Sequence, residues 1–253
     1  MAFYDRCDYR SYWHNRDYEN KAEVIALKSF FKLIPNPQKK VLADIGAGFG
    51  RHTPLYQPLF KKAILIDPSQ KLLQQAKKLL VDYPRLTFKQ GQAEKIPLKN
   101  ASCDVALLIR VIHHLPQVGP AFKEINRILK PGGFFLLEYA NKIHLKARVK
   151  AALKGDFHFS QKKETIDRRS AGNRNSQSIA FLNYHPQVIA GELKRNGFKI
   201  IGKRSVSNFR SPLLKKIVPL KILLWGEKTT QTLLAPFNFG PSIFILARKN
   251  NTP

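Results

Sequence analysis

Cysteine is scarce in this sequence. The 253 residues include only two cysteines, Cys7 and Cys103. Two are too few for a disulfide framework, and neither has a partner at metal-ligand spacing. The sequence therefore indicates a reducing compartment and predicts no metal site.

Long hydrophobic runs are also lacking. No apolar run approaches the roughly 20 residues that a membrane-spanning helix needs. The N-terminal residues mix acidic, basic and aromatic side chains and lack the apolar centre of a signal peptide. We expect a soluble, cytoplasmic protein.

Acidic residues are few. The chain has 17 Asp and Glu against 44 Lys and Arg, a net charge of +27, and residues 141–253 carry 22 basic but only 5 acidic residues. Such a field attracts nucleic acid, anionic lipid headgroups or phosphorylated substrates. A general enrichment in lysine without functional meaning is the alternative, although it explains the uneven distribution less well.

The hydrophobic content and the order of predicted elements are typical of a globular α/β protein. Hydrophobic residues make up 43% of the chain, enough to bury a sizeable core in one domain. Apolar strands alternate with helices, which indicates a parallel sheet covered on both faces. Strands are predicted at residues 41–48, 63–70, 86–91, 103–111, 134–140, 199–207 and 241–249, and helices at 18–34, 71–80, 121–133 and 185–198.

Two segments lie outside this alternation. Residues 141–184 are basic and polar, and residues 207–239 are inserted between the last two predicted strands, opening on Ser211-Pro212, a cap and first-turn pair. Both are candidate substrate-facing elements. We expect a single domain over 1–253, composed of an N-terminal helical segment at 1–40, a cofactor-binding half at 41–140, the basic insert at 141–184 and a C-terminal part at 185–253.

Three glycines at alternate positions follow the first predicted strand in VLADIGAGFGRH, residues 41–52. Glycine lets backbone approach a ligand closely, and in a doubly wound sheet ligands bind at the carboxyl ends of the strands. The spacing G-x-G-x-G differs from the G-x-G-x-x-G of a dinucleotide-binding turn. Asp67 ends the second strand, where a carboxylate can accept hydrogen bonds from ribose hydroxyls. The pattern predicts a nucleotide-like cofactor.

Further motifs follow in order: GQAEKIP at 91–97, CDVALLIRVIHHL at 103–115 and LKPGG at 129–133. Together with the Asp44–Gly50 turn and Asp67, they resemble the class I S-adenosylmethionine-dependent methyltransferases of the type 11 group, and GQAEKIP and LKPGG resemble its quinone-biosynthesis branch. The resemblance covers residues 41–140. It implies S-adenosyl-L-methionine as cofactor and a Rossmann-like, seven-stranded doubly wound sheet of order 3-2-1-4-5-7-6 with strand 7 antiparallel.

The resemblance also implies roles for individual residues. Gly46 and Gly48 would line the methionine moiety of the cofactor, and Asp44 would fix the loop or reach the amino group. Asp67 would hold the ribose. The other implied contacts are Gln92 and Ala93 to adenine, Ile109 and Arg110 beside the sulfonium, and Tyr12 and Arg16 over the carboxylate. Many relatives have Asp where this chain has Gln92.

Methyl transfer needs alignment of the nucleophile with the methyl group and exclusion of water, and a general base only for some acceptors. His113 and His114 are the candidate bases, because they follow the fourth strand and histidine titrates near neutral pH. Their alternative role is to cap and support the following helix. Glu138 and Tyr139, at the end of the fifth strand, are expected to face the substrate, and Tyr184-His185 is a further candidate.

Two common nucleic-acid chemistries are not supported by the sequence. Cys103 begins a core strand outside any Pro-Cys pair, which favours packing over a nucleophilic role, and no Asn/Asp-Pro-Pro-Tyr/Phe motif follows the fourth strand.

Three hypotheses about the acceptor remain. The favoured one is a small or lipid-like molecule, with peripheral membrane contact through the apolar, lysine-bearing segment 213–225. The second is RNA, in particular tRNA, attracted by the basic C-terminal part. The third is a non-catalytic protein of the same fold that binds cofactor or a partner. The acceptor atom and the oligomeric state are not specified by the sequence.

Overall fold

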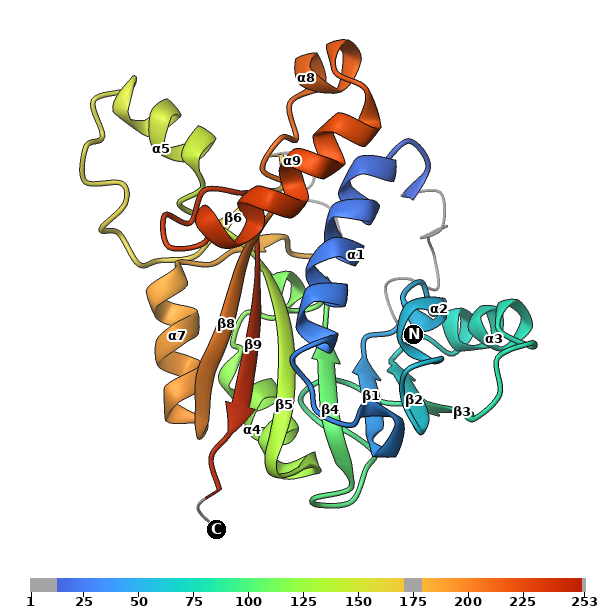
Figure 1. Ribbon diagram of the computed structural model, residues 1–253. Helices are drawn as coiled ribbons and strands as arrows, with labels where there is room; N and C mark the ends of the chain where they lie inside the picture. The colour runs from blue at the N-terminus through green and yellow to red at the C-terminus, as the bar shows by residue number, and fades with distance from the viewer. Residues whose placement is uncertain (1–12, 171–178, 252–253) are drawn as a thin grey trace.

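A seven-stranded sheet forms the centre of the molecule in the computed structural model, which describes residues 13–170 and 179–251 (Figure 1). The strand order is β3-β2-β1-β4-β5-β9-β8. β9 pairs antiparallel with both β5 and β8, whereas the pairs among β1 to β5 are parallel. The predicted order 3-2-1-4-5-7-6 with an antiparallel last strand is therefore confirmed. The strands are β1 Val41–Ile45, β2 Lys62–Asp67, β3 Leu86–Gln90, β4 Cys103–Leu108, β5 Leu129–Ala140, β8 Phe198–Val206 and β9 Ser242–Lys249.

Helices cover both faces of the sheet, as the alternating sequence predicts. One apolar core lies under α4 and α7 and the other under α1 and α3, and α1 also packs against α9. The helices are α1 Asp17–Phe31, α2 Thr53–Tyr56, α3 Gln70–Leu79, α4 Gly119–Ile128, α5 Leu145–Ala152, α7 Pro186–Arg195, α8 Pro212–Ile217 and α9 Leu220–Leu233.

The boundary between α4 and β5 differs from the prediction. The sequence predicts a helix from residue 121 that is stopped by Pro131-Gly132-Gly133, and a strand from 134, but α4 ends at Ile128 and β5 begins at Leu129. Leu129 is fully buried and pairs with Cys103 at the start of β4. Proline also disfavours the helical conformation in the residue that precedes it, which here is Lys130. Burial of Leu129 therefore ends the helix before the Pro-Gly-Gly segment does.

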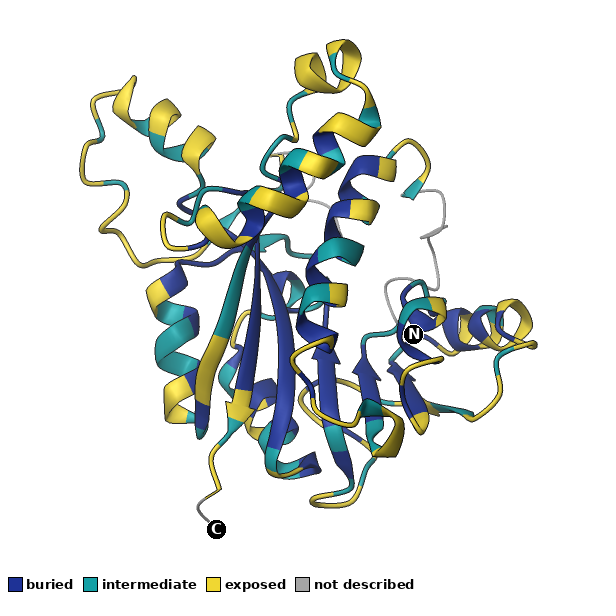
Figure 2. Cartoon of the chain, in the orientation of Figure 1, coloured by how far each residue is buried: buried dark blue, intermediate teal, exposed yellow. Residues whose placement is uncertain are grey.

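The two additional segments extend over the carboxyl edge of the parallel strands. α5, α8 and α9 lie at the top of Figure 1, and much of their surface is exposed in Figure 2. Residues 141–184 contain α5 and the short pair β6 Ile166–Asp167 and β7 Leu182–Asn183. α8 begins at Pro212 with Ser211 in the N-cap position, as predicted. Within the described residues, no helix is both long and apolar enough to cross a membrane.

Candidate active site

The glycine turn after β1 is held against β2 by its own backbone. The N–H groups of Gly46 and Ala47 donate to the carbonyl of Ile66 at 2.7 and 3.1 Å. Gly46, Gly48 and Gly50 all have positive φ, at 74°, 56° and 77°, a conformation that side chains rarely allow. A Cβ on Gly46 would lie 2.2 Å from Cγ2 of Val111. The turn therefore requires glycine for its conformation and for contact with the segment after β4, whatever ligand it also meets.

Asp67 connects the glycine turn to the start of α3. Its Oδ2 accepts the N–H of Gly48 and its Oδ1 accepts the N–H of Ser69, both at 2.8 Å. The hydroxyl of Ser69 in turn accepts the N–H of Leu72 and caps α3. A carboxylate oxygen can accept more than one hydrogen bond. Asp67 therefore fixes the glycine turn relative to the start of α3, and its role toward the ribose stays a prediction.

Asp44 is a buried carboxyl group at the end of β1. It accepts a hydrogen bond from the hydroxyl of Tyr56 at 2.9 Å. Burial raises the pKa of Asp44 to about 7, and the Tyr56 hydrogen bond only partly opposes this. A cationic group beside Asp44 would favour the ionised form. This fits the implied contact with the amino group of the cofactor.

A buried ion cluster, absent from the sequence-based prediction, ties α1 to the carboxyl edge. Glu23 of α1 is 0% exposed, and its carboxylate lies 2.6 Å from a guanidinium nitrogen of Arg51 and 2.6 Å from one of Arg110. Burial alone would raise the pKa of Glu23, but Arg110 and Arg51 outweigh it and hold that pKa well below the usual value. Both guanidinium groups also lie over the ring of Trp13, at 3.5 Å for Arg51 and 5.4 Å for Arg110.

Arg110 occupies an unusual backbone position directly after β4. Its φ is 62°, a conformation that costs energy in a non-glycine residue and is often found at functional sites. Its N–H donates to Oε2 of Glu138 at 3.0 Å. Burial raises the pKa of Glu138, and the positive charge of Arg110 opposes this. The peptide of Arg110 is thus fixed by β5 and its side chain by α1.

The remaining predicted cofactor contacts are spread along the same edge. Gln92 is exposed in a bridge with Lys95 after β3, whereas Ala93 and Ile109 are buried. Arg16 lines a separate recess of about 330 Å³ with Arg210 and Lys215. Tyr12 lies outside the described residues. The roles of these residues toward the cofactor stay predictions.

His113 and His114 form a short 3-10 turn, Ile112–His114, beyond β4. Their ring centroids are 4.0 Å apart, and the ring of Phe181 lies 4.5 Å from that of His113. Burial, reinforced by His114 and Arg110, lowers the pKa of His113 well below its usual value. Its Nδ1 has no hydrogen-bond partner among the described residues, while Nδ1 of His114 lies 2.7 Å from the carbonyl oxygen of Ala180. His113 is therefore a neutral imidazole with an uncommitted nitrogen.

Glu138 and Tyr139, both predicted to face the substrate, lie on opposite faces of β5, and their roles toward a substrate stay predictions. Adjacent residues of a strand point to opposite faces. Glu138 contacts Arg110, whereas Tyr139 belongs to the core under α4 and α7. The hydroxyl of Tyr139 is buried and has no partner among the described residues, and burial raises its pKa. The side chain of Tyr139 is therefore a neutral phenol that keeps its proton.

Other residues considered from the sequence have structural contacts. His185 caps α7 by accepting the N–H of Gln187 at 3.2 Å, and its other ring nitrogen lies 3.0 Å from the carbonyl of Ser160. The hydroxyl of Tyr184 donates to the carbonyl of Leu115. Burial raises the pKa of Cys103 to about 12, so it remains a thiol and does not act as a nucleophile.

The sheet order, the glycine turn and the acidic end of β2 together define a class I methyltransferase fold. The family model for a methyltransferase domain matches residues 43–137. The matched segment is the one that resembles the S-adenosylmethionine-dependent methyltransferases of class I fold, a family whose cofactor is S-adenosyl-L-methionine. This confirms the resemblance found in the sequence.

Three relatives illustrate the similarity. The chain is 31% identical over 96 residues to the uncharacterized methyltransferase YcgJ of Bacillus subtilis, covering 37% of this chain and 38% of that protein. It is 32% identical over 142 residues to the ubiquinone/menaquinone biosynthesis C-methyltransferase UbiE of Rickettsia bellii, covering 51% and 53%. It is 23% identical over 246 residues to a malonyl-[acyl-carrier protein] O-methyltransferase of a Marinomonas species, covering 94% and 91%. The match to this chain thus spans 38% of the length of YcgJ and 53% of the length of UbiE.

The fold is shared with solved structures at low identity. An S-adenosylmethionine-dependent methyltransferase from Mesorhizobium loti superimposes with a TM-score of 0.61 and 17% identity, covering 90% of this chain and 98% of that one. At this identity the likeness establishes the fold and leaves the acceptor undefined.

Proposed function

We propose that this chain transfers a methyl group from S-adenosylmethionine to a small, lipid-like acceptor. The main support is the meeting of the Gly46 turn, Asp44, Asp67 and the His113 segment at one sheet edge. β1 pairs in parallel with both β2 and β4, which brings these groups together. The cofactor supplies an electrophilic methyl group on a sulfonium.

In this proposal the protein orients the reactants. Asp67 anchors the ribose and Asp44 the amino group, while Gly46 and Gly48 give the methionine moiety close access to the backbone. The Glu23–Arg110 ion pair holds α1 over the end of β4 and keeps water from the reacting centre.

His113 is the proposed general base where the acceptor needs one. A neutral imidazole can take a proton from a phenol or an acidic carbon, and the lowered pKa of His113 makes its ring a weaker base than a free histidine. His114 is the alternative base. Its Nδ1 faces the carbonyl of Ala180, an arrangement that suits a positioning role.

The covering helices support a lipid-like acceptor and contact with an anionic membrane surface. Large apolar side chains on α8 and α9 are exposed, among them Ile217 and Trp225 at 69% each, next to lysines such as Lys216 and Lys221. Interfacial helices combine apolar and basic side chains in this way. UbiE is named for ubiquinone and menaquinone biosynthesis, which agrees with a quinone-like acceptor.

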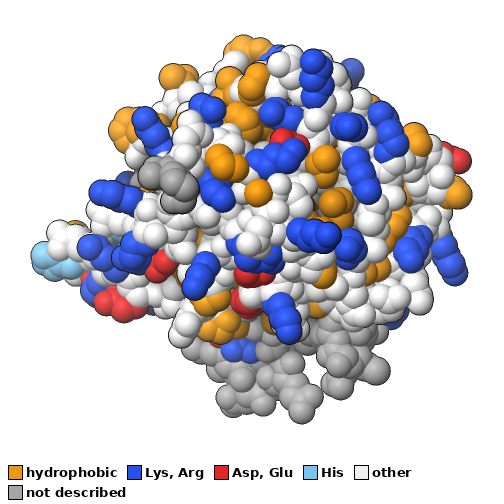
Figure 3. Space-filling view, turned by 90° about the horizontal axis from the view of Figure 1, so that it is seen from below, with side chains coloured by type: hydrophobic (Ala, Val, Ile, Leu, Met, Phe, Trp, Pro, Cys, Tyr) orange, Lys and Arg blue, Asp and Glu red, His pale blue; other side chains and the backbone are white. Residues whose placement is uncertain are grey.

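RNA is the second candidate acceptor, favoured by the net charge of +27. Lys and Arg side chains are spread widely over the face shown in Figure 3 and are not gathered in one track. Titration with bulk tRNA at two salt concentrations separates the candidates. A steep loss of affinity with salt supports RNA as acceptor, and the absence of binding supports a small molecule.

Alanine substitution of each histidine tests the proposed chemistry. With a quinone-type phenol as acceptor, we expect His113→Ala to lower turnover by about 100-fold or more, the usual scale of a general base, with unchanged affinity for the cofactor. We expect a smaller effect from His114→Ala. Single-turnover rates and cofactor titration give the two readouts. Full turnover of His113→Ala would remove its assignment as base.

A further inference from the structure

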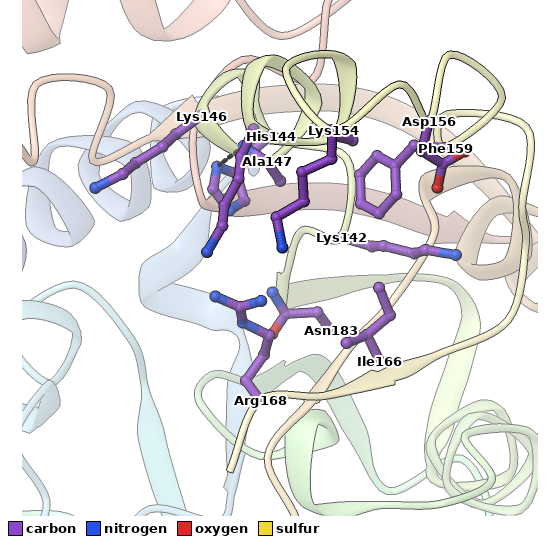
Figure 4. A pocket seen from close by; sticks show the side chains of 12 residues that line it. Lys142, His144, Lys146, Ala147, Lys154, Asp156, Phe159, Ile166, Arg168 and Asn183 are labelled. Atoms are coloured by element: carbon purple, nitrogen blue, oxygen red, sulfur yellow. Dashed lines mark hydrogen bonds between the residues drawn. The ribbon is translucent and has the colours of Figure 1, made fainter. Parts of the chain in front are cut away.

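A basic recess opens between α5 and the β6–β7 pair, close to the end of β5 (Figure 4). Its volume is about 510 Å³, within the range of small-molecule sites. Five Lys or Arg side chains line it, but only one carboxylate does. The lining comprises Lys142, His144, Lys146, Ala147, Lys150, Ala151, Lys154, Asp156, Phe159, Ile166, Arg168 and Asn183.

The single carboxylate does not neutralise the recess. Both oxygens of Asp156 accept hydrogen bonds from the ammonium of Lys162, at 2.9 and 2.8 Å, and Lys162 does not line the recess. Lys142 is buried and donates to the carbonyls of Lys162 and Glu164, so it fixes that loop. The remaining cations of the recess therefore have no carboxylate partner in its lining.

Those remaining cations are Lys146, Lys150, Lys154 and Arg168. None of the four forms an ion pair within the described residues. The three lysines are four residues apart on α5 and the turn after it, a spacing at which like charges repel. In Figure 4 the ends of Lys154, Arg168 and Asn183 point toward one another from opposite walls, with Lys146 at the outer edge.

His144 lines the recess, and its pKa is shifted by the positive charges around it. Burial, followed by the charges of Arg168, Lys146, Arg210 and Arg148, lowers its pKa to about 4. The imidazole is therefore neutral at physiological pH. Its Nδ1 accepts the N–H of Ala147 at 3.3 Å and caps α5.

A buried polar atom in the recess indicates a ligand independently of the charge. Asn183 is 8% exposed, and its Oδ1 has no hydrogen-bond partner among the described residues. Its Nδ2 makes one long hydrogen bond of 3.5 Å to the carbonyl of Asn141. A buried amide oxygen without a donor is costly. A ligand hydroxyl would satisfy it.

We propose that this recess binds a phosphate ester with a neighbouring hydroxyl group, as the anionic part of the acceptor. The inference rests on the proposed methyl transfer. Lys150, Lys154 and Arg168 would pair with the phosphate, and Asn183 would accept from the hydroxyl. Ala147, Ala151, Phe159 and Ile166 provide apolar surface for an adjoining carbon chain. The insert 141–184 is then the segment that selects the acceptor.

Calorimetric titration with glycerol 3-phosphate tests the recess, using a double variant and a matched control. We expect Lys150→Gln with Arg168→Gln to weaken binding at least tenfold. The control, Lys61→Gln with Lys78→Gln, removes the same charge from exposed positions before β2 and on α3 and is expected to bind like the wild type. Nitrogen NMR of His144 gives a local readout, because a bound phosphate is expected to raise its pKa in the wild type and the control alone.

Vesicles of phosphatidylglycerol distinguish the source of the phosphate. Vesicle binding that the double variant loses and the control keeps identifies a lipid headgroup. Binding of glycerol 3-phosphate without vesicle binding identifies a soluble acceptor. Equal weakening in both variants, or no binding of either probe by the wild type, would overturn the proposal. Titration of the same samples with S-adenosylmethionine separates a failure of the recess from a failure of the proposed methyl transfer.

Discussion

Asp44 and Glu23, two buried carboxyl groups at the carboxyl edge of the sheet, have pKa values shifted in opposite directions. Asp44 has a raised pKa because burial dominates, whereas Glu23 has a lowered pKa because two arginines outweigh burial. Glu23 is thus a charged structural tie, and Asp44 can respond to a cationic ligand. The sequence indicates the role of Asp44 through its motif but gives no sign of Glu23, which in the sequence is one acid among others in a predicted helix.

The titration of Asp44 predicts a pH dependence of cofactor binding. With its pKa raised to about 7, Asp44 contributes most to folding stability below its unfolded value of about 4 and loses that contribution as pH rises through 7. Binding of an ammonium group requires the ionised form. We expect affinity for S-adenosylmethionine to increase between about pH 6 and pH 7.5, below the pKa of the ligand's α-amino group.

Asp44→Asn is expected to remove this pH dependence. The pKa of His52 is lowered to about 4 and that of His113 well below its usual value, so these two rings stay neutral over the same range. Calorimetry at three pH values provides the measurement. A slope that persists in the variant would assign the titration to another group.

At the scale of elements, α1 is attached to the sheet by charge as well as by apolar packing. Residues 23, 51 and 110 meet although they are far apart in the sequence. Contact among these three residues depends on tertiary packing, which the pattern of apolar residues along the sequence does not predict. The strand order was implied by the resemblance of the motifs to a known family. The predicted end of α4 at the Pro-Gly-Gly stop is late, because the buried Leu129 already pairs with Cys103 in the sheet.

Removal of the Glu23 carboxylate is expected to destabilise the protein. Glu23→Gln removes the carboxylate that pairs with the partly buried guanidinium groups of Arg51 and Arg110, and breaking a buried ion pair typically costs about 3–5 kcal/mol. Urea denaturation followed by circular dichroism measures the free energy of unfolding. Glu94→Gln is the control, since Glu94 is exposed. Equal stability of the two variants would contradict a structural role for the cluster.

At the scale of the whole molecule, charge alone does not define the function. The net charge of +27 is spread over the surface, whereas the recess beside α5 concentrates unpaired cations around a buried amide. The basic character of residues 141–184 was visible in the sequence. Its arrangement around a cavity was not, because that depends on how α5 faces the β6–β7 pair.

Calorimetric titration of the purified protein with S-adenosylmethionine is the most direct test of the account. We predict one site per chain, with affinity at least tenfold weaker in Asp67→Asn and unchanged in Asp82→Asn, where the side chain is exposed. Asp67→Asn retains one acceptor oxygen, so the fold should persist in circular dichroism. An absence of cofactor binding by the wild type, or equal affinity in Asp67→Asn, would contradict the proposed site.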